Sequence, residues 1–271
     1  MIERTRMPDV REEARHSPGH SRNLLAGAPI SQVAVWAAII AVAGTIPWIF
    51  PMQGGGGAFP MSIPVAPLAG IVLGPVAGFA ACLVGGAIDL IIAPYTAGIG
   101  LLSPFSIAFA ALGAGSLVQR PRRNLWLPGI LAPIFLLWLW ADFAFLVQDF
   151  PMPQILLVGG LDILPSWIVG LAGARWAAKQ IERNETQAAW RLFLALWILC
   201  YYGVAAMQHG FEWAVWQMMF RFPAEPSIAT SLAFTWWERI FIYAGIGALI
   251  GTPVILGLKR MGLRRPAHGR W

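Results

Sequence analysis

The chain alternates long apolar stretches with short polar ones, and this pattern predicts a protein that crosses a membrane several times. After a polar segment over 1–25, eight apolar stretches follow, approximately at 30–50, 61–73, 75–92, 104–118, 127–147, 155–177, 188–206 and 232–258. A helix needs about 20 residues to cross a hydrocarbon core of about 30 Å. Five of the eight stretches reach or approach that length. We therefore expect an all-α polytopic membrane protein, a bundle of about eight transmembrane helices.

The remaining three stretches are short for a membrane span. Residues 61–73 and 104–118 fall below the required length, 75–92 is marginal, and all three are bordered or interrupted by Pro or Gly. Either the helices extend beyond these limits, or broken helices line a polar cavity, where interrupted backbone is tolerated inside a membrane. The sequence leaves both possibilities open.

Composition supports lipid as the solvent of most of the surface. Hydrophobic residues make up 58% of the chain, charged residues only 12%, and mean hydropathy is +0.64. A soluble domain carries roughly a quarter charged residues. The two cysteines, Cys82 and Cys200, lie in separate apolar stretches, which excludes a disulfide framework, a CxxC pair and a zinc cluster.

The basic residues predict the orientation of the bundle. If the N-terminus is cytoplasmic, eight crossings place the loops near 119–126 and 178–187 and the C-terminus on the same side. Of the 19 Lys and Arg residues, only Arg221 and Arg239 then fall on the other side. Positive charge in short loops marks the cytoplasmic side, so we expect a multi-pass membrane protein with both termini in the cytoplasm. The net charge of +6 is thus an orientation signal and requires no nucleic-acid partner.

Four carboxyl residues interrupt the apolar stretches at a similar height near the outer face: Asp89, Asp142, Asp162 and Glu238. A carboxyl group that faces lipid costs a few kcal/mol, so these side chains are expected to face the bundle interior or water. Snorkelling to the interface is the alternative for any one of them. Together they predict an outward-facing polar cavity, whose excess of acids favours a cationic or amine-bearing ligand.

Aromatic residues accompany these acids. Trp138 and Trp167 lie close in sequence to Asp142 and Asp162, and their faces could stack on a flat ligand, although an aromatic belt at the interface is the simpler reading. The stretch 211–222 (FEWAVWQMMFRF) is expected to lie on the outer surface as an amphipathic segment. His209, just before it, is interpreted as structural.

Between residues 70 and 86, small residues recur at every fourth position: Gly70, Gly74, Gly78, Cys82 and Gly86. This spacing lets helix backbones approach closely inside a membrane, where lipid supplies no hydrophobic drive. Gly74-Pro75 is expected to form a tight turn between the second and third helices.

The same region resembles the substrate-binding S components of energy-coupling factor (ECF) vitamin transporters. The shared features are a G-P-x-x-G turn, a small-residue helix with a late Asp, and a Pro-Phe pair that opens a short Gly-rich helix. The match covers about 60 of the 271 residues, and the residues that carry its motifs are Gly74, Pro75, Gly78, Asp89, Pro104, Phe105, Gly113 and Gly115. The resemblance implies a multi-pass protein of a bacterial inner membrane that captures a small organic nutrient, such as a vitamin, from the outer side.

The resemblance also implies a lid over the ligand. In the family, the outer loop after the first helix covers the bound molecule. The corresponding loop here contains a run of four residues without side chains: Gly54, Gly55, Gly56 and Gly57. Glycine has no preferred backbone conformation, so we expect this run to act as a mobile hinge, with an ordinary flexible connector as the alternative.

A docking face follows from the same resemblance. The A-x-x-x-A pairs Ala34/Ala38 and Ala37/Ala41 fit the pattern by which family members dock on the transmembrane T component, which works with ATPase subunits. Family members usually have six helices. We therefore expect a six-helix core over 26–180, an added hairpin over 181–258, and basic tails over 1–25 and 259–271.

These features predict a vitamin-binding subunit of an ECF importer, with no cofactor, no metal and no enzymatic activity. Its expected substrate-binding residues are Asp142, Asp162, Trp138, Trp167, Glu238 and Asp89. The chain has no GxxxxGK[ST] loop, so separate ATPases would supply the energy. Two alternatives remain: a non-transporting scaffold subunit of a larger membrane complex, and an intramembrane aspartyl protease that uses Asp142 and Asp162, neither of which lies in a G-x-G-D sequence.

Overall fold

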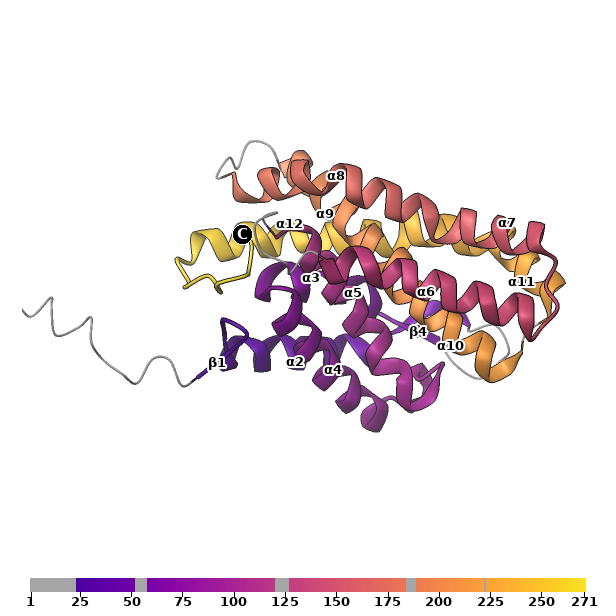
Figure 1. Cartoon of the computed structure of the whole chain (residues 1–271). Coiled ribbons are helices and arrows are strands. Elements are labelled where there is room, and N and C mark those ends of the chain that lie inside the picture. The colour runs from indigo at the N-terminus through magenta and orange to yellow at the C-terminus, as the bar shows by residue number, and fades with distance from the viewer. Residues whose placement is uncertain (1–22, 52–57, 120–126, 184–188, 222) are drawn as a thin grey trace, which may run out of the picture.

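The protein is a helical bundle in the computed structural model, which describes residues 23–51, 58–119, 127–183, 189–221 and 223–271 (Figure 1). Within these ranges, six helices are long and apolar enough to cross a membrane, and two more apolar helices are shorter. The all-α class and the eight predicted helices are therefore confirmed, but six of the helices, and not all eight, are long enough to be candidate membrane spans. Six such helices suggest a multi-pass membrane protein.

Several of the eight helical rods are built from more than one segment. The first five are α2 (Ile30–Gly44), α3 (Ser62–Leu73), α4 (Pro75–Ile92), α5 (Ser103–Leu117) and α6 (Leu127–Leu146). The sixth joins α7 (Met152–Asp162) to α8 (Leu164–Glu182), and the seventh joins α9 (Ala189–Tyr201), π-helical η5 (Tyr202–His209) and α10 (Gly210–Phe220). The eighth contains α11 (Ala224–Thr230), π-helical η6 (Ser231–Thr235) and η7 (Glu238–Tyr243), and α12 (Ala244–Arg260).

Short non-helical elements connect the rods. Two antiparallel strand pairs are present, β1 (Leu24–Leu25) with β2 (Ala28–Pro29), and β3 (Pro47–Pro51) with β4 (Ala58–Pro60). Two 3₁₀ turns, η1 (Pro94–Thr96) and η2 (Gly100–Leu102), lie between α4 and α5. The β3–β4 pair follows α2, at the end of that helix away from β1 (Figure 1).

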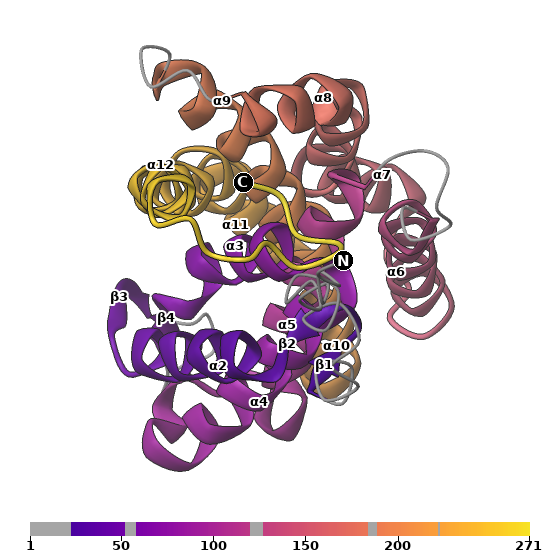
Figure 2. The same ribbon diagram turned by 90° about the vertical axis from the view of Figure 1, so that its left-hand side faces the viewer.

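Successive rods run in opposite directions, so the described N-terminal segment and the C-terminus lie at one end of the bundle (Figures 1 and 2). Hydrogen bonds join three distant parts of the chain there. The amide of Gln32 donates to the carbonyl of Arg264 (3.1 Å), and Lys259 donates to the carbonyl of Arg183 (2.5 Å). We call this the basic end, because Lys259, Arg264 and Arg183 belong to the loop and the C-terminal segment that the sequence assigns to the cytoplasm.

The C-terminal segment covers the basic end. The backbone N–H of Arg270 donates to the carbonyl of Ile71 (2.9 Å), and its side chain pairs with Glu182 (2.5 Å). Trp271 is buried in the core. The predicted basic tail therefore folds back onto the end of α3, whose last carbonyls have no partner within the helix.

The short helix α3 is completely buried, from Ser62 to Leu73. Its 12 residues span about 18 Å, well below the thickness of a bilayer core. Pro60, Ser62 and Ile63 line a cavity above it. Of the two possibilities for 61–73, the structure therefore favours a short helix that borders a cavity. The helix does not extend far beyond the predicted limits.

Helices α3, α4 and α5 pack backbone to backbone at the glycine stripe. A Cβ atom on Gly70 would lie 2.6 Å from the carbonyl carbon of Ala111 in α5 and would overlap its oxygen. One on Gly78 would lie 2.5 Å from the Cα of Gly70. Gly74 has φ +94° and separates α3 from α4, which confirms the predicted close approach and the tight turn.

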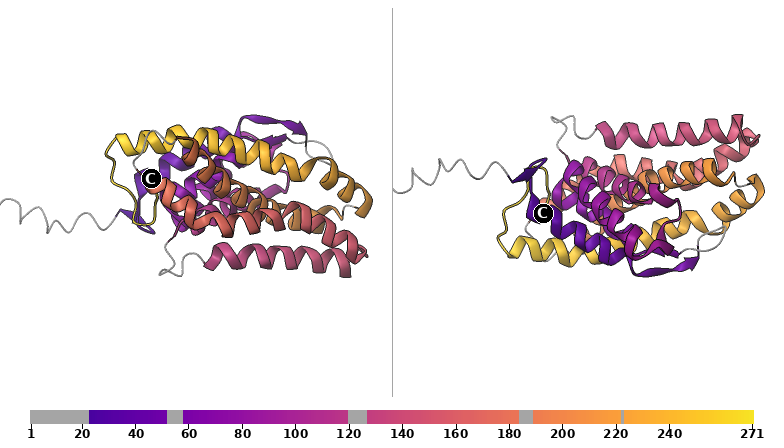
Figure 3. Two further views of the ribbon diagram at one scale, coloured as in Figure 1. Left: turned by 90° about the horizontal axis from the view of Figure 1, so that it is seen from above. Right: turned by 90° about the horizontal axis from the view of Figure 1, so that it is seen from below.

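One hydrophobic core runs through the predicted six-helix region and the last hairpin. Gly203 of η5 faces the carbonyl of Ala110 in α5, and Gly247 of α12 faces the carbonyl of Pro64 in α3. Tyr202, Cys200 and Ala248 belong to the same buried cluster as the α3–α5 residues. The residues after 181 therefore complete the bundle that surrounds α3 (Figure 3).

Candidate functional site

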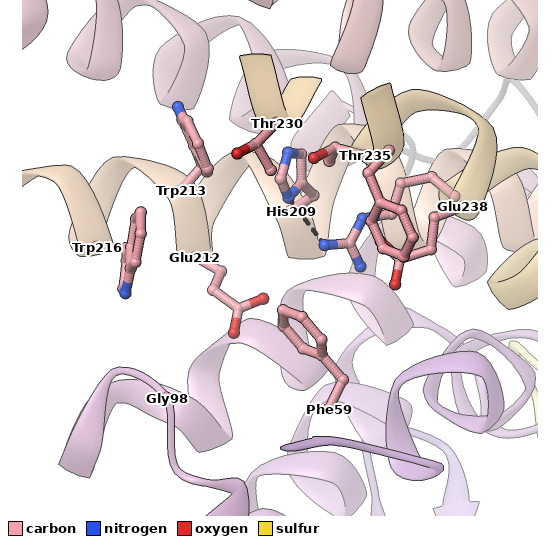
Figure 4. Close-up of a pocket in the computed structure, with 11 residues that line it drawn as sticks. Phe59, Gly98, His209, Glu212, Trp213, Trp216, Thr230, Thr235 and Glu238 are labelled. Carbon is pink, nitrogen blue, oxygen red and sulfur yellow. Dashed lines mark hydrogen bonds between the residues drawn. The ribbon is translucent and has the colours of Figure 1, made fainter. Parts of the chain in front are cut away.

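A cavity lies in the half of the bundle away from the basic end. Its volume is about 630 Å³, counting its open side. The cavity lies between β4, the loop after η1, α10 and the π-helical segments η6 and η7. Its walls consist of Phe59, Gly98, His209, Glu212, Trp213, Trp216, Thr230, Phe234, Thr235, Glu238 and Arg239 (Figure 4).

One wall of this cavity comes from a single helix face. The wall begins at His209, the last residue of η5, and continues into α10 with Glu212, Trp213 and Trp216. These three residues follow His209 by three, four and seven positions, which places all four on one side of the seventh rod. The Trp213 ring lies 5.5 Å from the His209 ring and 5.6 Å from the Trp216 ring, centroid to centroid. Trp213 is buried, whereas Trp216 is partly exposed.

This wall corrects the expectation for 211–222. The stretch continues the seventh rod as α10 and does not lie flat on the surface, because the helix from Ala189 to Phe220 is unbroken (Figure 1). Trp213, Ala214 and Gln217 are buried against other parts of the bundle. The apolar side of the segment faces protein. The same amphipathic pattern therefore fits both a helix that lies on the membrane surface and a helix that packs into the bundle.

The opposite wall comes from π-helical turns. Thr235 ends η6, and Glu238 and Arg239 begin η7. His209 ends η5 on the facing rod. A π-turn bonds i to i+5 and is wider than an α-turn, and such turns occur frequently at functional sites. Both rods thus lose regular α-helical geometry where they meet the cavity.

A chain of polar contacts connects the two walls behind the aromatic rings. The Ser231 hydroxyl donates to Asp162 Oδ2 (2.7 Å), and His209 Nε2 lies 3.7 Å from the same oxygen. Arg239 Nη2 lies 3.1 Å from His209 Nδ1. Arginine can only donate, so Nδ1 accepts and the proton of a neutral His209 is on Nε2, toward Asp162.

A second, smaller cavity adjoins the first. It is lined by Asp89, Thr96 and residues at the start of α3 and α5, and Glu212 contributes to both cavities. Asp89 is buried and accepts a hydrogen bond from the Thr96 hydroxyl (3.3 Å). The Asp89 carboxyl also lies directly against Gly44, where a Cβ atom would overlap it.

Three of the six predicted substrate-binding residues lie at or behind a cavity wall, and the other three do not. Glu238 lines the first cavity, Asp162 supports His209 from behind, and Asp89 lines the second cavity. Asp142 lines neither cavity. Trp138 is 56% exposed on α6 and so faces away from the protein interior, and partly buried Trp167 packs against the core without reaching the cavity.

The predicted docking pairs also differ from each other. Ala37 and Ala41 are buried, and the Ala37 carbonyl lies against Gly85 of α4. Ala34 and Ala38 lie on the exposed face of α2. The first pair therefore serves packing within the chain, and only the second pair is available to a partner.

The predicted lid lies in the interval between β3 and β4. All four of its glycines fall outside the described residues, which stop at 51 and resume at 58: Gly54, Gly55, Gly56 and Gly57. The strands on either side are described, and Phe59 of β4 is part of the cavity wall. The lid itself therefore stays a prediction from the sequence.

Sequence reasoning missed most of the α10 wall. The sequence pattern indicates a structural role for His209 and assigns Glu212, Trp213 and Trp216 to a surface segment. Their common spacing is a usable signal, because three aromatic or titratable residues follow His209 on one helix face. Phe59 offers no such signal, since it comes from a strand distant in sequence.

Replacing Asp162 by Asn is expected to weaken any ligand bound in the first cavity by roughly fivefold to tenfold, because the neutral amide no longer holds the Nε2–H tautomer of His209 as strongly. The measurement is calorimetric titration of the detergent-purified protein. Asp142→Asn is the matched control, because Asp142 precedes Asp162 by one helix and lines neither cavity. Equal affinities of the two variants would remove Asp162 from the site.

The described part of the chain contains no group of three His, Cys, Asp or Glu side chains placed to hold a metal ion. The cavity is thus best described as an aromatic pocket with buried charges. Comparison of the chain with protein-family models, with curated proteins and with solved structures gave no match.

Proposed function

We propose that this protein captures a small organic molecule from the outer side of a bacterial inner membrane, as the substrate-binding subunit of an importer of the energy-coupling factor type. The observation that carries the proposal is the cavity between α10 and η6–η7, away from the basic end. Basic residues mark the cytoplasmic end of membrane helices, so the cavity belongs to the outer half.

The lining of the cavity fits a ligand site. Pockets for small molecules combine mostly apolar and aromatic walls with a few polar groups. Here Phe59, Trp213, Trp216 and Phe234 provide rings, while the polar groups are carboxyls, a guanidinium, an imidazole and two hydroxyls. A protein that only needed to pack its helices would fill this space with apolar side chains.

The importer assignment rests on the family resemblance of residues 67–115. Two of its features have a structural counterpart: the G-P-x-x-G motif forms the turn at Gly74, and the late Asp89 lines the second cavity. The partners would be a transmembrane T component and ATPase subunits. The exposed face of α2, with Ala34 and Ala38, is the part of the predicted docking region that remains accessible.

Two measurements on the full-length protein test this proposal. Mass spectrometry of small molecules released from the detergent-purified chain is expected to reveal a retained aromatic compound. Affinity purification from native membranes is expected to recover ATPase subunits. A stable assembly without ATPases and without a retained compound would instead favour a scaffold subunit of a larger complex.

A further inference from the structure

Two neighbouring residues of opposite charge, Glu238 and Arg239, line the cavity without forming a direct ion pair. Glu238 and Arg239 are each 2% exposed. No ion pair joins them, and no carboxylate of the described residues forms an ion pair with Arg239. Among the described residues, neither Glu238 Oε1 nor Arg239 Nε has a hydrogen-bond partner. Buried charges are costly unless they are paired, so neither residue has the ion-pair partner that its burial requires.

The guanidinium of Arg239 is nevertheless held in a fixed position. It lies 4.8 Å from the Tyr243 ring centroid and 5.6 Å from that of Phe59, and it contacts His209 Nδ1. Its other contact, to Gln208 Oε1, is long at 3.5 Å. Aromatic rings stabilise a cation without consuming its N–H donors. Arg239 is therefore preorganised and keeps donor capacity for an acceptor in the cavity.

Acidic groups surround this arginine and restrict which anion could bind. Glu238 and Glu212 both line the cavity (Figure 4), and Asp162 Oδ2 lies 3.7 Å from His209 Nε2. A ligand with an acid group alone would be repelled by the two glutamates. A ligand with an amine alone would leave Arg239 without an ion-pair partner. The combination favours a ligand that carries both charges.

We propose that the cavity binds a flat aromatic molecule that carries an acid group and an amine. Its acid group pairs with Arg239, its amine lies between Glu238 and Glu212, and its ring packs among Trp213, Trp216 and Phe234. This inference rests on the proposed function and specifies its substrate class. It also reconciles the excess of acids in the outer half with a buried arginine that has no ion-pair partner at the same site.

Four indole probes test the proposal on the unmodified protein: indole, tryptamine, indole-3-propionate and tryptophan. They share one ring and carry no charge, an amine, an acid, or both. Calorimetric titration of the detergent-purified chain is expected to show that tryptophan binds roughly 10-fold or more tightly than any of the others. Equal or tighter binding of tryptamine would overturn the acid contact, and equal or tighter binding of indole-3-propionate would overturn the amine contact.

Two variants assign the contacts to residues. Arg239→Gln is expected to lower the affinity for tryptophan roughly 10- to 100-fold and to leave tryptamine bound as well as before. Glu238→Gln is expected to weaken the binding of tryptophan and of tryptamine by a similar factor, and to leave indole-3-propionate bound at least as tightly as before, because one of the two repelling carboxylates is gone. The matched control is Arg221→Gln, because Arg221 is exposed and does not line the cavity. If Arg239→Gln weakens all four probes equally, the arginine is structural and the inference fails.

The outcomes also separate this inference from the proposed function. If a retained aromatic compound lacks an acid group or lacks an amine, capture of a small molecule stands and the zwitterionic substrate class is wrong. If none of the four probes binds and no compound is retained, both are wrong. Thermal unfolding of each variant without ligand verifies that the cavity is still formed.

Discussion

Gly70→Ala is expected to be the most destabilising single-methyl substitution considered for this chain. The added Cβ would overlap the Ala111 carbonyl oxygen, a backbone atom that cannot rotate away. Gly78 and Gly115 also contact Gly70 through backbone atoms, so α3, α4 and α5 would have to separate together. Overpacking of this kind costs about 1–3 kcal/mol, which corresponds to a melting temperature roughly 2–12 °C lower for a chain of this size.

The control for this substitution is Gly160→Ala in α7. A Cβ at Gly160 meets nothing within 4 Å, and alanine favours a helix over glycine by about 1 kcal/mol. This variant should be as stable as the parent or slightly more so. Thermal unfolding in detergent, followed by tryptophan fluorescence, compares the two. If both variants melt at the parent's temperature, the backbone-to-backbone contact of α3 with α5 does not exist.

Trp216→Ala is expected to have the largest effect on ligand binding with little effect on folding. Its ring lines the cavity and is only partly buried, so its removal opens a wall without creating a hole in the core. Loss of ring-to-ring contact and of buried apolar area should weaken the binding of indole roughly 10- to 100-fold.

Trp138→Ala serves as the control for this second prediction. The sequence pattern places Trp138 at the site, but the residue is 56% exposed on α6 and does not reach the cavity. The affinity of Trp138→Ala for indole should equal that of the parent. A larger loss in Trp138→Ala than in Trp216→Ala would place the ligand site on α6 and would contradict the cavity between α10 and η6–η7.

Much of the fold follows from one-dimensional patterns. The apolar stretches predict all eight helices, and the four-residue spacing of small side chains predicts the close packing of α3, α4 and α5. These features are local, because helix formation and side-chain spacing depend on neighbours in the sequence. The apolar pattern underestimates the last two helices, since polar residues such as Glu212 and Glu225 lie in the parts of the helices that it leaves out.

The site could be predicted only in part. The depth of a carboxyl in an apolar stretch marks Asp89, Asp162 and Glu238, and all three lie at or behind a cavity wall. The same criterion selects Asp142, because depth along a helix does not determine the direction in which a side chain points. Trp138 is selected for the same reason and faces outward.

The sequence by itself determined that this chain is a bundle of apolar helices with its basic residues gathered at one end. Only the tertiary structure decided that His209, Glu238 and Arg239 meet, because the seventh and eighth rods pack side by side there and their wide π-turns set the direction of each side chain. The hydrophobicity of a stretch depends only on consecutive residues, whereas a binding site requires side chains from distant parts of the chain that meet in space.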